Sequence, residues 1–120
     1  PYLGLLVSGG HSAFFYVEAS DKFKLIGTTL DDAAGEAFDK GGKLLGLGYP
    51  AGRIIDQIAK FGDAKKIPFS LPMKNQNSAD LSFSGIKTAL RVYLEKNPQI
   101  LKLKPAQYEN KEDASQVFYD

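Results

Sequence analysis

The sequence contains no cysteine, and this absence excludes two kinds of site. Without Cys, the 120 residues can form neither a disulfide framework nor a thiolate metal site. A chain of this kind suits a reducing compartment, so we expect a cytoplasmic protein. His11 is the only histidine, and one histidine cannot make a metal site by itself.

Long apolar runs and an excess of one charge are also absent. No run of about 18 apolar residues occurs, so the sequence predicts no transmembrane helix and no membrane partner. No signal-peptide pattern opens the chain. The formal net charge of +1 gives no electrostatic argument for binding to nucleic acid. With 43% hydrophobic residues, the composition fits one small soluble domain.

Both ends of the sequence are abrupt. Pro1 leads at once into the apolar run 3–7, and a helical pattern over 111–120 stops without a C-cap. These ends predict a single partial domain over 1–120 that is the central segment of a longer protein. Such a segment exposes apolar edge surface, so we expect it to self-associate.

Hydrophobic patterning predicts an α/β (α+β) chain that begins with an antiparallel β-meander over residues 1–30. Apolar runs at 3–7 and 13–17 and an alternating run at 23–28 are typical of strands. Turn residues at 8–12 and 19–22 separate them. The meander is followed directly by helical patterning.

Two helices joined by a glycine loop are predicted over residues 31–62, the first beginning at Asp32. Its apolar residues recur at helical spacing and form one stripe: Ala34, Ala37, Phe38, Gly41, Leu44 and Leu45. Glycines at 35, 41 and 42 each cost a helix roughly 1 kcal/mol relative to alanine. We therefore expect something to approach this backbone closely. Gly46 provides a helix stop.

The second predicted helix follows the glycine loop at 48–52. Its buried side is formed by Ile54, Ile55, Ile58 and Ala59. Asp56 lies on its polar side. The first helix and the loop, together with this carboxylate, can line one wall of a cleft.

The remaining residues are expected to form an extended segment and loop over 63–85 and a helical segment over 86–120. Two prolines within 67–73 forbid helix there. The last well-defined helix is predicted to begin at Ile86, with Ser84 as a possible cap, and to end before the next proline. Lys87 near this serine-glycine turn could also meet an anion, although capping and solvation account for these residues more simply.

The turn Ser8-Gly9-Gly10-His11-Ser12 admits two interpretations. Its backbone N–H groups and hydroxyls can wrap around a phosphate or carboxylate, as anion nests do. On spacing alone, a simple glycine hairpin turn is the better interpretation. His11 either orients a substrate or has only a structural role, and no catalytic residue is identified.

Four segments together resemble one family, the tRNA threonylcarbamoyladenosine transferases of the TsaD or Gcp group, formerly described as O-sialoglycoprotein endopeptidases. The matching segments are 5–12, 31–39, 43–49 and 81–88, in family order. Each is weak alone, but their combination is specific. The chain departs from the family pattern at Ala51, where glycine is usual, and at Gly41 and Gly42, where other residues are frequent.

The resemblance implies the fold and the reaction. The family has the actin-like ATPase (ASKHA) fold, with two RNase H-like domains and a nucleotide cleft between them, and this segment would begin the second domain. The implied activity is transfer of a threonylcarbamoyl group from threonylcarbamoyl-adenylate to N6 of adenosine 37, in tRNAs that read codons beginning with A. We expect the segment alone to be inactive.

The resemblance also implies binding residues. The loop that holds the substrate's phosphate and acyl part matches Leu6, Val7, Ser8, Gly9 and Gly10. Positions that bind the adenylate match Asp39, Gly52 and Asp56. The carboxylates of the two aspartates can accept hydrogen bonds from ribose hydroxyls, and the glycine allows the backbone to approach closely.

The implied cofactor is a divalent metal, iron or zinc. Its family ligands, a His-x-x-x-His pair upstream and an Asp downstream, lie outside this segment, so we expect no metal site here. The implied partners are tRNA, threonylcarbamoyl-adenylate and accessory proteins of the modification complex. Two alternatives stay open: a metal-dependent O-sialoglycoprotein endopeptidase, as in the older family label, and a non-catalytic nucleotide-binding module of the same fold.

Overall fold

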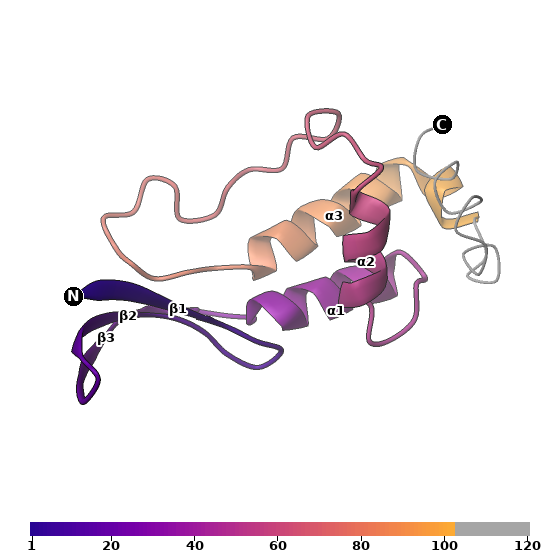
Figure 1. Cartoon of the computed structure of the whole chain (residues 1–120). Helices are drawn as coiled ribbons and strands as arrows, with labels where there is room; N and C mark the ends of the chain where they lie inside the picture. The colour runs from indigo at the N-terminus through magenta and orange to yellow at the C-terminus, as the bar shows by residue number, and fades with distance from the viewer. Residues whose placement is uncertain (103–120) are drawn as a thin grey trace. The chain divides into compact units, whose positions relative to one another are not determined.

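The computed structural model describes residues 1–102 (Figure 1). Three strands come first and helices follow, as the patterning predicted. The elements are β1 (Tyr2–Val7), β2 (Ser12–Ala19), β3 (Lys22–Thr28), α1 (Ala34–Leu44), α2 (Gly52–Ala59), α3 (Ser84–Lys96) and the 3-10 helix η1 (Pro98–Lys102). The helical pattern predicted over 111–120 lies outside the described residues.

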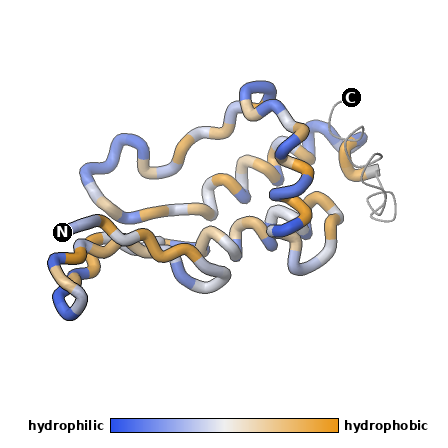
Figure 2. The backbone as a smooth tube through the Cα atoms, in the orientation of Figure 1, coloured by the Kyte–Doolittle hydropathy of each residue, from blue (hydrophilic) through white to orange (hydrophobic). Residues whose placement is uncertain are grey.

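The strands form an antiparallel sheet in the order β1-β2-β3, which confirms the predicted meander. Leu6 lies opposite Ala13, and Phe15 lies opposite Leu25. Phe15 also makes an edge-to-face contact with Phe23, with ring centroids 6.2 Å apart. Figure 2 shows hydrophobic residues along most of the three strands.

The chain divides into two compact units. Unit 1 comprises Pro1–Ala37 and Ser70–Lys87. Unit 2 comprises Phe38–Phe69 and the residues from Thr88 on. The division passes through α1 and α3, so the first turn of each helix belongs to unit 1.

In unit 1, the segment 79–81 is fastened along the end of β3. Leu81 donates its N–H to the carbonyl of Thr28 (3.0 Å) and accepts the N–H of Leu30 (2.8 Å). Gly27 permits this approach, because a Cβ there would lie 2.0 Å from the carbonyl oxygen of Ala79. The loop before α3 is therefore joined to the meander.

In unit 2, α1 ends at the predicted glycine. Gly46 has a φ of +73°, the left-handed conformation that glycine adopts without strain. Its N–H donates to the carbonyl of Lys43 (3.1 Å), while Leu47 donates to that of Gly42 (2.9 Å). This pair of bonds is a Schellman motif, and Leu47 is buried beneath it.

Two helices begin at other residues than predicted. α1 begins at Ala34 rather than Asp32, because the carbonyl of Asp32 accepts the Thr29 hydroxyl (2.6 Å) before the helix starts. α3 begins at Ser84 rather than Ile86, because a distant carboxylate binds its first N–H groups. Sequence spacing could not show that partner.

The apolar faces of the helices are covered less than predicted. Phe38, placed in the buried stripe, is 51% exposed. No residue of α2 is fully buried, so its isoleucines are only partly covered; Figure 2 colours this helix alternately orange and blue. Leu94 of α3 is buried instead, with 4% exposure. Within residues 1–102, no helix is both long and apolar enough to cross a membrane.

Candidate functional site

The turn between β1 and β2 is held closed by its own ends. Ser8 donates its N–H to the carbonyl of His11 (2.8 Å), and its hydroxyl donates to the same oxygen (3.2 Å). The N–H of His11 donates back to Ser8 Oγ (2.9 Å). These reciprocal bonds give His11 a structural role through its backbone.

Gly9 and Gly10 lie at the tip of this turn, and the side on which each would carry a Cβ is open. A Cβ added to either glycine would meet no atom within 4 Å. Neither has the positive φ that requires glycine, and no hydrogen bond of the described residues engages their N–H groups. Two backbone donors are thus available to an incoming anion.

The first turn of α1 lies directly against this tip. The N–H of Gly35 donates to the carbonyl of Ser8 (3.2 Å). A Cβ at position 35 would lie 2.6 Å from the Cα of Gly9, so only glycine fits without displacing the turn. The close approach that the glycines of this helix predicted is, at Gly35, an approach by the backbone of Ser8 and Gly9.

Asp39 and Gly52 are brought together within unit 2. Asp39 Oδ1 accepts the N–H groups of Ala51 (2.9 Å) and Gly52 (3.4 Å), at the start of α2. Ala51 makes no side-chain cap of its own, so Asp39 supplies the cap from α1. The second carboxylate oxygen of Asp39 has no hydrogen bond within the described part of the chain.

Asp56 lies one turn after Gly52 on α2. Its carboxylate pairs with Lys60 at 3.9 Å, and its side chain is 78% exposed. An ion pair this open to solvent contributes little to stability. Asp56 is therefore available to a ligand.

Leu6 and Val7, the other predicted binding residues, lie in β1 opposite Ala13 and Ser12. Both are largely exposed. Together with the turn they belong to unit 1, whereas the adenylate-binding candidates belong to unit 2. The candidate residues therefore form two groups, one in each unit.

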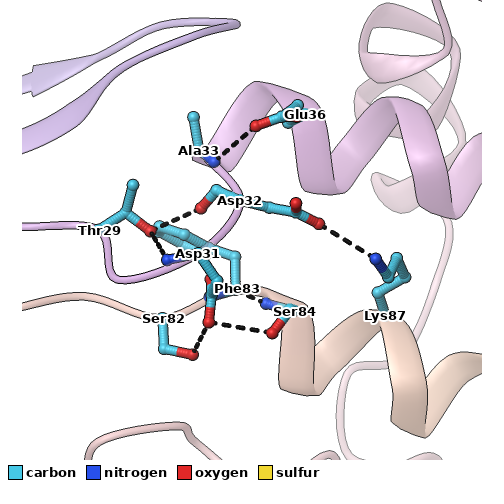
Figure 3. A network of polar contacts seen from close by, with 9 residues as sticks. All are labelled: Thr29, Asp31, Asp32, Ala33, Glu36, Ser82, Phe83, Ser84 and Lys87. Carbon is cyan, nitrogen blue, oxygen red and sulfur yellow. Dashed lines mark hydrogen bonds and ion pairs between the residues drawn. The ribbon is translucent and has the colours of Figure 1, made fainter.

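Sequence reasoning missed two polar arrangements of unit 1. Ser12 is 2% exposed, and its hydroxyl accepts the N–H of Ala34 at 2.9 Å. Asp31 joins residues 82–84 through four hydrogen bonds (Figure 3). A serine or aspartate before a helix signals a cap, but the distant partner in each case is visible only in the fold.

The Asp31 carboxylate is unusually acidic for an exposed group. Partial burial alone would raise its pKa, but the hydroxyl of Ser82 and the N–H and hydroxyl groups at 83–84 lower the pKa to about 2. A similar effect lowers the pKa of Asp80, which accepts the N–H of Thr28 and the Ser78 hydroxyl. Both carboxylates are thus ionised at neutral pH.

Lys87, considered above as an anion contact, pairs with a carboxylate of the chain itself. Its Nζ lies 3.3 Å from Asp32 Oδ2, and both side chains are mostly covered. Within residues 1–102, no group of three or more His, Cys, Asp or Glu side chains could hold a metal ion. The described residues therefore do not fit a metal centre.

These features define an α/β chain in which a glycine turn with free backbone donors lies on the start of a helix. Comparison with known proteins gives the family. The model of the TsaD family, tRNA N6-adenosine threonylcarbamoyltransferase, matches residues 1–118, and the chain belongs to this family. Enzymes of this family have the ASKHA fold and use a metal.

Curated relatives carry the same description. The chain is 53% identical over 98 residues to the tRNA N6-adenosine threonylcarbamoyltransferase of Geotalea uraniireducens, covering 82% of this chain and 29% of the relative. It is 54% identical over 98 residues to that of Endomicrobium trichonymphae, covering 82% and 28%. For Thermotoga neapolitana the identity is 50% over 96 residues, covering 80% and 29%. The chain thus spans less than a third of the length of these relatives.

Proposed function

We propose that this chain forms part of a tRNA N6-adenosine threonylcarbamoyltransferase and supplies part of its adenylate-binding wall. The reaction transfers a threonylcarbamoyl group from threonylcarbamoyl-adenylate to N6 of adenosine 37 in tRNAs that read codons beginning with A. Family membership supports the reaction class. The observation that carries the binding role is the Gly9-Gly10 tip.

The tip suits the phosphate of the adenylate. The fold needs glycine at neither position, since both have ordinary φ values and open space where a Cβ would stand. Their N–H groups are free of acceptors among the described residues. An anion held by such donors gains hydrogen bonds that the turn does not make for itself. The glycines are explained by a ligand that approaches the backbone.

The second group of residues suits the ribose. Asp39 uses one carboxylate oxygen for the backbone of α2 and leaves the other for a hydroxyl. Asp56 follows Gly52 by four residues, so it lies on the same side of α2. Gly52 has no side chain to keep a ligand from its backbone. We assign these three residues to the adenosine part of the substrate.

The remaining functional assignments follow from the family. The partners would be tRNA and the accessory proteins of the modification complex, in the cytoplasm. The metal, iron or zinc, would be held by residues elsewhere in the longer protein. We expect no transferase activity from the 120 residues alone.

Calorimetric titration with AMP tests the binding role. We expect the chain to bind AMP and Gly10→Ala to weaken binding by roughly tenfold or more, since a methyl group at the tip would restrict how closely a ligand approaches its backbone. Gly41→Ala is the matched control, because a Cβ there would make only an ordinary 3.5 Å contact with Leu90. Equal affinity of all three folded proteins would refute the phosphate role of the turn.

A further inference from the structure

The segment 28–35 of unit 1, which joins β3 to α1, is held along its length by two other parts of the chain. The turn 8–12 binds it on the side of the meander. The segment 80–87 binds it from the loop and α3. Most residues of the segment 28–35 make a hydrogen bond to the turn 8–12 or to the segment 80–87.

The bonds to the turn determine where the glycine tip lies. Thr29 donates its N–H to the carbonyl of Ser12 (2.9 Å), and the N–H of Ala34 donates to the hydroxyl of the same serine (2.9 Å). Gly35 donates to Ser8 and touches Gly9. The tip therefore follows the position of residues 29–35.

The hydrogen bonds between the segment 28–35 and residues 82–84 converge on Asp31 (Figure 3). Its Oδ1 accepts the N–H groups of Phe83 (2.8 Å) and Ser84 (3.1 Å). Its Oδ2 accepts the hydroxyls of Ser82 (2.5 Å) and Ser84 (2.9 Å). One carboxylate thus uses both oxygens to join residues more than fifty positions apart.

We propose that Asp31 is a positioning residue for the candidate phosphate turn, because it anchors the segment on which the Gly9-Gly10 tip lies. The carboxylate touches no residue of the tip and acts through the backbone of 29–35. Asp31 makes four hydrogen bonds to residues 82–84. The effect on ligand binding rests on the proposed function, but the effect on the turn does not.

Amide hydrogen exchange of the full chain tests the anchoring without any ligand. In Asp31→Asn, we expect the amides of Thr29, Ala34 and Gly35 to exchange about tenfold faster, because the segment loses its charged anchor. Amides within the β2–β3 pair should change by less than about twofold. Asp21→Asn, which removes an equal charge from the exposed turn between β2 and β3, should leave both groups unchanged.

A second variant separates anchoring from general loss of structure. Asp31→Ala leaves a cradle of two N–H groups and two hydroxyls, into which formate can bind in place of the carboxylate. Excess formate should restore slow exchange at Gly35 in this variant and have no effect on the wild-type chain. Ser82→Ala, which removes one donor, should give an intermediate rate.

The outcomes distinguish the inference from the proposed function. Unchanged exchange at Gly35 in Asp31→Asn, or equal acceleration throughout the sheet, would overturn the positioning role. Faster exchange at Gly35 with formate rescue supports it whether or not the chain binds AMP. Where the wild type binds AMP, Asp31→Asn should bind it about tenfold more weakly, with formate restoring affinity in Asp31→Ala.

Discussion

Gly42 and Ala51 share a space that holds only one methyl group. A Cβ at position 42 would lie 1.9 Å from that of Ala51, and Ala51 is completely buried. Glycine at 42 therefore leaves room for the methyl group of Ala51 where α1 meets the start of α2.

Gly42→Ala should destabilise the chain, and the exchange of both residues should restore it. Overpacking costs about 1–3 kcal/mol, which exceeds the roughly 1 kcal/mol gained from helix propensity. Adding Ala51→Gly removes the clash, so a double-mutant cycle in urea should show a coupling of at least about 1 kcal/mol. Gly41→Ala, with an ordinary contact, should be neutral or stabilising. Additive effects at 42 and 51 would contradict the shared space.

Asp31 should make stability depend on pH below the neutral range. Its pKa is about 2 in the folded chain, against an ordinary value of 3.8. Because the folded pKa is the lower one, the stabilisation is present above pH 4 and is lost as the pH falls toward 2. We expect a loss of roughly 1 kcal/mol, less than the full shift would give, since the carboxylate is exposed.

Urea unfolding of the wild type and Asp31→Asn at several pH values measures this term. The two curves of stability against pH should converge as the pH falls from about 4 to about 2. Asp80 keeps its own acid dependence in both proteins, so only the difference belongs to Asp31. Parallel curves would show that the hydrogen bonds to 82–84 do not favour the ionised form.

At the scale of elements, α2 starts where a carboxylate of α1 caps it. Asp39→Ala removes the acceptor of two N–H groups and should cost about 1 kcal/mol, with faster amide exchange in the first turn of α2. Asp39→Asn keeps an oxygen acceptor in place and should retain most of the stability. AMP affinity should fall in both variants if the second oxygen also binds ribose. Equal destabilisation by both would indicate that charge, rather than capping, supports the helix start.

The sequence predicts these elements well where local chemistry determines them. Two apolar runs and one alternating run predict the meander, and Gly46 predicts the end of α1, where it has a positive φ. The starts of α1 and α3 are displaced by two residues, because Thr29 and Asp31 supply bonds from outside the helices. A partner fifty residues away leaves no trace in helical periodicity.

In the candidate site, too, the sequence predicts what local residues determine and misses what distant partners determine. Glycines in the first helix predict close approach to its backbone, and Gly35 and Gly42 confirm it, whereas Gly41 has only an ordinary contact. The order of motifs predicts the family, which residues 1–118 match. The capping role of Asp39 and the anchoring by Asp31 could not be predicted, since each joins segments that only the folded chain brings together. The binding roles themselves remain predictions for the experiments above.

At the scale of the whole molecule, β1 is the surface that the described residues leave most uncovered. Its large side chains are exposed on both faces, and it pairs only with β2 within residues 1–102. It carries neither charge nor proline, the usual protections of an edge strand. β3, at the other edge, carries Lys22 and Lys24 and binds Leu81 at its end. Association of the chain with itself should therefore use β1.

We expect the apparent mass in light scattering to rise with concentration and Leu5→Lys to prevent the rise. A lysine in an edge strand opposes pairing with a second copy, because two like charges would meet beside the shared strands. Leu25→Lys is the matched control, since Leu25 in β3 is 52% exposed and Leu5 is 54% exposed. It adds the same charge at the edge already protected by lysines, so association should persist. A monomer at every concentration, or equal dissociation by both lysines, would show that the bare edge of β1 does not drive association.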